Sequence, residues 1–350
     1  MKKKNFLSML VFTLVFALFA VACGGGGNQA EQPKPAEQPA EQPAEQPAQP
    51  EASKGETPDS IIIATGGTSG TYYPLGGGMA QIFTDKAGIN SSAQSTGASV
   101  ENMRLIKDGQ VDLAFTQGDI ADYASKGSVM FKEGGAIGNL TAIASLYNET
   151  VQIIVAKDSP IKTVEDLKGK RVSVGAPGSG TEANAQQILE IHGLTFDDLG
   201  KADRLAFGES ASFIQDGTLD AAFVTAGTPT AAVNELAATK GVRVIGIAEE
   251  QMAKIIEQYP YYASQNIPAG TYPGFDEEVN TVAVKAQLVA RAELDETLVY
   301  NMTKALYENM DQMKTVHAKA AEINIEKALE GVSLDVHPGA AKYFEEKGIK

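Results

Sequence analysis

The chain has 350 residues, a single cysteine and a formal net charge of −15, with 44 acidic and 29 basic residues. This acidic excess argues against a nucleic-acid partner, because phosphate binding requires clustered Lys and Arg. One cysteine excludes an internal disulfide, and three scattered histidines do not have zinc-ligand spacing. We therefore expect no metal and no cofactor.

Residues 1–22 are typical of an export signal. Lys2 to Lys4 precede an apolar stretch from Phe6 to Ala22, which ends in the small residues Ala20-Val21-Ala22. The position of Cys23 directly after them resembles a bacterial lipobox, although Ala20 stands where Leu is usual. We expect Cys23 to carry a lipid anchor. An uncleaved membrane helix is the alternative, but the stretch barely reaches the ~20 residues needed to span a bilayer.

Residues 23–59 predict a disordered tether behind the lipidated cysteine. The segment contains four consecutive glycines and then Ala-Glu-Gln-Pro starting at 30, 36, 40 and 44. It has too few apolar side chains to offset the entropy of ordering. We see no chemistry in this repeat.

The folded part, from residue 60, alternates between strand and helix patterns. Residues 61–64 predict a buried strand, 65–71 a glycine-rich turn, and 72–83 a helix with one apolar face. The elements expected next are a strand at 91–94, a turn at 95–99, a helix ending at Asp108-Gly109 and a strand at 111–116. This order predicts α/β layers around a mostly parallel sheet.

The second half of the chain continues the alternation. We expect strands at 140–146, 151–156, 171–174, 221–224 and 242–247, and a helix through Ile188 and Leu189 after the turn at 177–181. Residues 294–316 predict one helix with a stripe of Leu and Met. That stripe indicates core packing rather than a cofactor site, because Met fills irregular gaps.

Two passages of the sequence occur twice at nearly the same offset. Ser69-Gly70-Thr71 recurs as Ser179-Gly180-Thr181, and Asp-Gly-x-x-Asp-x-Ala-Phe at 108–115 recurs at 216–223. The repeat predicts two similarly built lobes with a ligand cleft between them. We place lobe 1 at 60–148 and 266–350 and lobe 2 at 149–265. The chain should cross first near 147–150 and return between 248 and 268.

Three turns of small residues, at 66–71, 96–99 and 178–181, each precede a predicted helix. Glycine lets a ligand approach the backbone, and free N–H groups at a helix start attract an anion. The alternative is that Ser and Thr only cap these helices. The turn at 95–99 has no clear counterpart in the second repeat, so we expect an asymmetric site with most contacts from lobe 1.

Several other polar residues follow predicted strands or turns. Gln117, Asp119 and Thr225 come directly after strands and should face the cleft, where Gln117 or Asp119 could accept from a ligand ammonium group. Asp112 and Asp220 follow Asp-Gly turns, and we interpret them as scaffold. The large tyrosines Tyr72, Tyr73 and Tyr147 are either cleft walls or core.

Enzyme signatures are scarce. The sequence has no Gly-x-Ser-x-Gly elbow, no phosphate-loop Gly-Lys-Ser/Thr and no His-Glu-x-x-His. We therefore expect a binding protein rather than an enzyme, with a secreted enzyme of similar two-lobed fold as an alternative.

Three motifs resemble the TAXI branch of the solute-binding proteins that serve TRAP (tripartite ATP-independent periplasmic) transporters. They are TGGTSGTYYPLGGGMA at 65–80, STGASVENMRLIKDGQVDLAFTQGD at 95–119 and DLKGKRVSVGAPGSGTE at 166–182. The resemblance covers roughly residues 60–346. It implies a two-lobed type II periplasmic-binding fold that delivers a small carboxylate, such as glutamate or a related amino acid or dicarboxylate, to an ion-driven permease.

These arguments and the resemblance together define a candidate site. The expected ligand contacts are Ser69, Gly70, Thr71, Tyr73, Ser95, Thr96, Gly97, Gln117, Tyr147, Ser179, Gly180, Thr181 and Thr225. We expect a monomer, held to the membrane only by its lipid, on a Gram-positive surface or in a periplasm. A binding module for a sensor or for another transporter class is the alternative.

Overall fold

The computed structural model describes residues 55–349, which belong to the unit Glu51–Lys350. The predicted export signal, Cys23 and the tether up to residue 54 lie outside the described residues. No helix in the described part is long and apolar enough to cross a membrane.

All named strands of the described part belong to one mixed sheet with the order β2-β1-β3-β10-β4-β7-β5-β6, while β8 pairs with β4 and β9 with β10. The strands are β1 Ile61–Ala64, β2 Ser91–Gln94, β3 Leu113–Gln117, β4 Leu140–Ala156, β5 Arg171–Ser173, β6 Lys201–Asp203, β7 Ala221–Ala226, β8 Val242–Ile245, β9 Ala263–Ile267 and β10 Val279–Arg291.

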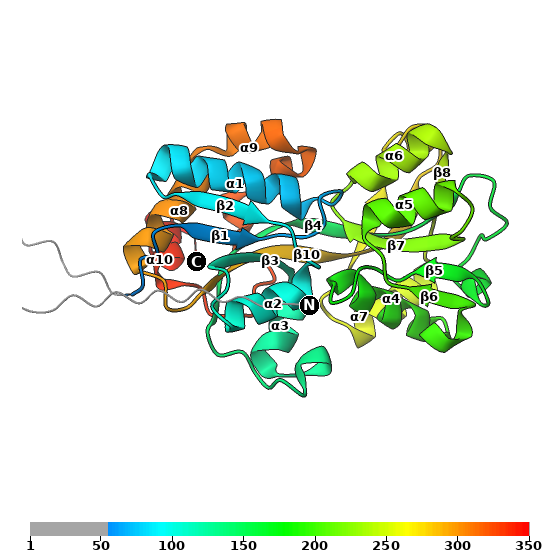
Figure 1. Ribbon diagram of the computed structural model, residues 1–350, viewed down its shortest axis with the longest axis horizontal. Coiled ribbons are helices and arrows are strands. Elements are labelled where there is room, and N and C mark those ends of the chain that lie inside the picture. Colours follow the sequence, from blue (N-terminus) through cyan, green and yellow to red (C-terminus); the bar gives the residue numbers. More distant parts are fainter. Residues whose placement is uncertain (1–54, 350) are drawn as a thin grey trace, which may run out of the picture. The chain divides into compact units, whose positions relative to one another are not determined.

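Helices cover both faces of the sheet in each half of the unit (Figure 1). The α-helices are α1 Tyr72–Ala87, α2 Ser99–Lys107, α3 Gly118–Lys126, α4 Gly180–Ile191, α5 Phe207–Gln215, α6 Ala231–Thr239, α7 Glu249–Gln258, α8 Glu296–Glu308, α9 Met310–Val316 and α10 Pro338–Glu346. Short 3₁₀ turns occur at Val129–Phe131, Glu165–Leu167, Phe196–Asp198, Ala318–Glu322 and Ile325–Lys327.

The two lobes repeat one topology. In lobe 1, β1-α1-β2-α2-β3 gives the parallel order β2-β1-β3, and in lobe 2, β5-α4-β6-α5-β7 gives β6-β5-β7. The long antiparallel strands β4 and β10 lie between these triplets and run through both lobes (Figure 1). The repeated sequence passages therefore correspond to a repeated α/β unit, as the sequence predicted.

The first crossing between lobes occurs inside one continuous strand. We expected separate strands at 140–146 and 151–156, but β4 is unbroken, and Thr150 pairs with Ala283 of β10 on one side and Ala226 of β7 on the other. A run of apolar and β-branched residues on both sides of 147–150 favours this continuation.

The chain returns to lobe 1 later than we expected. Ile267, Tyr272 and Phe275 pack in lobe 2, as do Val282 and Val284, whereas the next inward residues of β10 pack in lobe 1. The return is therefore the middle of β10, not the segment 248–268. The predicted helix at 294–316 is also divided, with Asn309 between α8 and α9, and its Met302 and Met313 are buried in the lobe 1 core.

Glycines allow α1 to lie directly against the sheet. A Cβ on Gly76 would overlap the side chain of Thr65, at the end of β1, and would contact Phe115. This close approach brings the start of α1 next to the carboxyl end of β1, where ligands bind in open α/β sheets.

Candidate functional site

A cavity of about 390 Å³ lies between the two lobes. Four turns surround it, each at the start of a helix, together with residues from β4 and from the ends of β3 and β7. The lining residues are Gly67–Tyr72, Ser95–Ser99, Gln117, Glu149, Ala176, Ser179–Thr181, Ala206–Glu209, Thr225 and Ala226. Eleven of the thirteen predicted contacts are in this set; Tyr73 and Tyr147 are not.

The turn before α1 touches both lobes. The Thr71 hydroxyl donates to the carbonyl of Gly227 in lobe 2 at 3.2 Å, and the carbonyl of Ser69 accepts from the N–H of Ala232, also in lobe 2. This turn therefore closes one side of the cavity. Its backbone N–H groups lie at the positive end of α1.

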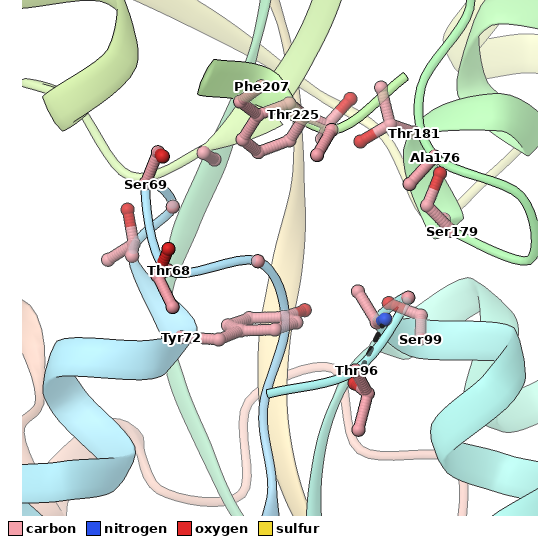
Figure 2. A pocket seen from close by; sticks show the side chains of 18 of the residues that line it. Thr68, Ser69, Tyr72, Thr96, Ser99, Ala176, Ser179, Thr181, Phe207 and Thr225 are labelled. Atoms are coloured by element: carbon pink, nitrogen blue, oxygen red, sulfur yellow. Dashed lines mark hydrogen bonds between the residues drawn. The ribbon is translucent and has the colours of Figure 1, made fainter. Parts of the chain in front are cut away.

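The turn before α4 is organised by a side-chain cap. The Ser179 hydroxyl accepts from the N–H of Glu182 at 3.1 Å, so capping accounts for part of its role. Thr181 is buried and carries its hydroxyl into the lining opposite Tyr72 (Figure 2). Ser179 thus both caps α4 and lines the cavity, whereas Thr181 lines the cavity without capping the helix.

The turn before α2 has a different role from the one we predicted. The N–H groups of Val100 and Glu101 both donate to the carbonyl of Gly178 in lobe 2, at 3.1 Å each. The N–H of Gly97 donates to the carboxylate of Glu101 at 2.8 Å. The start of α2 is therefore already occupied by protein acceptors, and it joins the lobes instead of offering free donors.

The hydroxyls of Ser95 and Thr96 also make internal bonds. Ser95 donates to the carbonyl of Gly66 at 3.0 Å, and Thr96 lies within 3.0 Å of the Thr65 carbonyl and 2.6 Å of the Asn102 amide oxygen. These contacts hold the first two turns together at the edge of the cavity.

The sequence analysis missed a fourth helix start, Ala206–Glu209, which is the N-cap and first turn of α5. It is the lobe 2 counterpart of the turn before α2, because each connects the second strand and second helix of its repeat. Glu209 accepts from the N–H of Ala206 at 3.1 Å. The Phe207 ring lies beside Gly70 of the turn before α1: a Cβ placed on Gly70 would be 3.5 Å from the ring. The turn at 95–99 therefore does have a counterpart in lobe 2, contrary to our expectation, and both lobes line the cavity. That most ligand contacts come from lobe 1 stays a prediction.

The sequence analysis selected candidate binding turns by their clusters of Gly, Ser and Thr residues, and this criterion could not find the start of α5. Ala206, Phe207 and Gly208 carry no side-chain donor. The position of the turn within the repeated strand–helix order was the only indication available.

Tyr73 and Tyr147 lie outside the lining. Tyr73 is 37% exposed on α1, whereas Tyr147 is buried in the lobe 1 core. The Tyr147 hydroxyl nevertheless donates to Glu149, at 3.3 Å. Its contribution to the site is thus indirect, through a carboxylate that the sequence analysis did not identify.

Glu149, on β4 where the chain crosses between lobes, is the main residue that the sequence analysis missed. It lines the cavity, is only 2% exposed, and accepts from the amide of Gln117 at 3.2 Å. Burial is the largest influence on this carboxyl and raises its pKa to about 8. The sequence analysis interpreted residues 147–150 only as the place where the chain crosses between the lobes, and so gave Glu149 no role in the site.

A polar interface between the lobes adjoins the site. Gln117 donates to Asn184 of α4 at 3.0 Å, and Asn184 donates in turn to Tyr262. Asp119 of α3 is completely buried, and burial raises its pKa to about 7. Asp119 is not in the cavity lining, so it belongs to the interface rather than to the expected cleft surface.

Acidic side chains are, apart from one tyrosine, the only titratable groups of the described lining. Within the described residues, it includes two carboxylates, Glu149 and Glu209, but no His, Cys, Lys or Arg. No group of three or more His, Cys, Asp or Glu side chains in residues 55–349 is placed to hold a metal ion. The arrangement suits reversible binding of a small polar molecule.

A family model described as the NMT1-like family matches residues 63–348. The chain belongs to the NMT1-like family. Its fold is similar to PhnD1 from Prochlorococcus marinus (MIT 9301), solved in complex with methylphosphonate, with a TM-score of 0.52, 12% identity, and coverage of 83% of this chain and 98% of the other.

Two further solved structures are similar. A protein from Bordetella bronchiseptica RB50 gives a TM-score of 0.51 with 17% identity, covering 85% of this chain and 84% of the other. SsuA from Escherichia coli, a periplasmic aliphatic sulphonate binding protein, gives 0.44 with 18% identity, covering 83% and 79%. The α/β architecture of this NMT1-like protein is thus shared with PhnD1 and with the Bordetella protein.

Proposed function

We propose that this NMT1-like protein is an extracytoplasmic solute-binding protein for a small carboxylate, such as glutamate or a related amino acid or dicarboxylate. One observation carries the proposal: the starts of α1, α4 and α5 surround a single cavity of about 390 Å³ between the lobes. That volume is near the lower end of the ~300–1,000 Å³ range for ligand pockets, which suits a metabolite of amino-acid size.

Helix starts supply part of the affinity. Each contributes about 0.3–1 kcal/mol at an exposed position and up to ~2 kcal/mol when partly buried. Micromolar binding requires about 8 kcal/mol. The remainder must come from the hydroxyls of the lining and from closure of the lobes, since excluding water strengthens every polar contact.

We further propose that the protein delivers its ligand to a TRAP permease driven by an ion gradient. The TAXI-like motifs at 65–80, 95–119 and 166–182 support this assignment, and all three contribute to the cavity lining. Membrane attachment through Cys23 fits this role, because it keeps the binding protein near its permease. Cys23 itself lies outside the described residues.

The direct test is mass spectrometry of ligand that copurifies with native protein, followed by calorimetry with that ligand. We expect a small carboxylate, recovered intact and bound with micromolar or tighter affinity. Chemical conversion of the ligand by the purified protein would instead support an enzyme. Failure to bind any small carboxylate would reject the proposed ligand class.

The delivery step and the anchor have separate tests. Reconstituted uptake should require the protein, its permease and an ion gradient, and should continue without ATP. A requirement for ATP hydrolysis would favour another transporter class. A Cys23→Ser variant should lose its lipid and leave the membrane fraction; if it remains lipidated, the anchor is elsewhere.

A further inference from the structure

Glu149 is an acidic group in the cavity lining with no cationic partner there. Its two carboxylate oxygens accept from Tyr147 at 3.3 Å and from Gln117 at 3.2 Å. A carboxylate offers about four acceptor positions, so these two bonds leave capacity for further donors. Both partners are neutral, and therefore neither compensates the charge.

Nearby cations do not supply the missing countercharge. Among the described residues, no Lys, Arg or His lines the cavity. Lys319, which is buried in lobe 1, forms an ion pair with Glu322. A buried carboxylate without a countercharge is costly, and one that lines a cavity can be compensated by a ligand.

Gln117 presents a second acceptor beside this carboxylate. The amide nitrogen of Gln117 donates one N–H to Glu149 and the other to Asn184, so both of its N–H groups are used. With Glu149 ionised, reversing the amide would place two oxygens against each other, so the amide nitrogen of Gln117 faces Glu149 in that state. Its own oxygen is buried and has no hydrogen-bond partner among the described residues. The site therefore lacks a donor at two adjacent acceptors.

Two hydroxyls of the lining, those of Tyr72 and Thr225, make no hydrogen bond of standard length within the described part of the chain, and both residues are mostly buried. The Tyr72 hydroxyl lies near enough to Glu149 and Ser99 to influence the pKa values at the site. Figure 2 shows the Tyr72 ring along one side of the cavity, with its hydroxyl end toward the turn that carries Ser99. Hydroxyls can donate or accept, so they fit a polar ligand without fixing the sign of its charge.

We propose that the ligand carries a protonated amine, and that Glu149, with the amide oxygen of Gln117, accepts its N–H groups. This inference rests on the proposed function, because the carboxylate of the same ligand would lie at the helix starts. It narrows the ligand class from small carboxylates in general to amino acids or other amino-carboxylates. A simple dicarboxylate has no N–H group to donate to Glu149 or to the amide oxygen of Gln117.

Calorimetry with pairs of ligands that differ only in the amine tests the proposal. The probes are glutamate against glutarate, aspartate against succinate, and alanine against propionate. We expect the wild type to prefer the amine-bearing member of the pair it binds by about 30-fold, within the range for hydrogen bonds to charged groups. Equal affinity for both members would overturn the inference while leaving a carboxylate-binding function intact.

An isosteric variant then assigns the preference to one residue. Glu149→Gln should lose about 30-fold in affinity for the amine-bearing ligand and change affinity for its deaminated partner by no more than about twofold. Glu345→Gln, which removes one exposed acid on α10, controls for net charge, and melting curves control for folding. Equal losses for both ligands would show that Glu149 only supports the fold.

The pH dependence of ligand affinity shows whether Glu149 binds the ligand as an ionised carboxylate or as a neutral carboxylic acid. Tyr72, Tyr147 and Asp119 are the titratable groups that act on Glu149, and burial keeps both tyrosines neutral across this range. Wild-type affinity for the amino acid should rise from pH 6 to pH 9, and the rise should be reduced in Glu149→Gln, which retains only the titration of Asp119. A fall in affinity with rising pH that depends on Glu149 would show a neutral acid donating to the ligand, and would overturn the proposal. If no member of any pair binds, the proposed function fails and the inference fails with it.

Discussion

Asp112 and Asp220 make the same two interactions in the two lobes. Asp112 accepts from the N–H of Ile62 on β1, and Asp220 accepts from the N–H of Arg171 on β5, both at 2.8 Å. Each carboxylate also pairs with an arginine, Arg291 for Asp112 and the side chain of Arg171 for Asp220. The repeated Asp-Gly passage therefore ties the third strand of each lobe to its first strand, away from the cavity.

Because Asp112 ties two strands together away from the cavity, its removal should lower protein stability without changing ligand affinity. Asp112→Ala should lower the free energy of unfolding by about 1–3 kcal/mol, because the N–H of Ile62 loses its acceptor and Arg291 keeps only its pair with Glu56. Urea denaturation measures the stability, and calorimetry of the folded variant should return the wild-type affinity. A large loss of affinity in fully folded protein would contradict the scaffold role.

Gly180 is the position where lobe contact is most sensitive to a side chain. A Cβ there would overlap the amide of Gln117, which is held by Glu149 and Asn184 and is not free to move aside. We expect Gly180→Ala to weaken ligand binding about tenfold or more by keeping the lobes apart, an effect of the size known for steric overpacking of ~1–3 kcal/mol.

Small-angle scattering with saturating ligand distinguishes this mechanism from simple loss of a contact. The wild type should become more compact with ligand, whereas Gly180→Ala should change less. Gly77→Ala is the matched control, because a Cβ on Gly77 of α1 has no neighbouring atom within 4 Å. Compaction equal to the wild type in Gly180→Ala would contradict a steric block.

Ser179 and Thr181 lie two residues apart but should respond differently to removal of their hydroxyls. Ser179→Ala loses a helix cap and should cost about 1 kcal/mol of stability. Thr181→Ala removes a hydroxyl from the cavity lining and should reduce affinity about threefold to tenfold, the effect of one hydrogen bond. Melting temperatures and calorimetry of both variants separate the two effects. Unchanged affinity in both would move the ligand away from the start of α4.

The repeated topology could be predicted from sequence because its signals are local. The Ser-Gly-Thr turn and the Asp-Gly passage recur at nearly the same offset, and each corresponds to part of the repeated α/β unit. The crossings were harder to locate, because β4 and β10 continue through both lobes and have no turn signal where their packing partners change. Only the tertiary structure defines those boundaries.

The site was predictable where chemistry and local sequence coincide. The turns before α1 and α4 carry hydroxyls and glycines, and they line the cavity as expected. The importance of Glu149 depends instead on burial by two lobes, which no local pattern records. For the turn before α2, the sequence indicated a helix start but could not reveal that Gly178 from the other lobe occupies its donors.

Asp122 is a buried acid whose pKa is lowered, in contrast to Asp119 on the same helix. Burial opposes ionisation of its carboxyl, but hydrogen bonds from Lys126 and Tyr261 outweigh burial and lower its pKa. Its ionised form therefore stabilises the fold above the ordinary pKa of 3.8, and that contribution is lost as pH falls through the lowered folded value. Asp122→Asn should reduce stability at pH 7, with a difference from wild type that shrinks in acid.

Asp119, three residues earlier on α3, should behave in the opposite way. Burial raises its pKa from 3.8 to about 7, so between these values the folded state holds a proton that the unfolded state has released. Stability contributed by this group therefore falls as pH rises from about 4 to about 7, on the order of 1 kcal/mol per pH unit. Asp119→Asn should remove its part of this pH dependence and be more stable than wild type at pH 8.

Glu149 makes a similar contribution to the pH dependence of stability, up to about pH 8, and keeps it in the Asp119→Asn variant. In urea denaturation, the free energy of unfolding should therefore vary less with pH in Asp119→Asn than in wild type, and less again when Glu149→Gln is added. Parallel wild-type and Asp119→Asn curves would mean that Asp119 stays ionised in the folded protein.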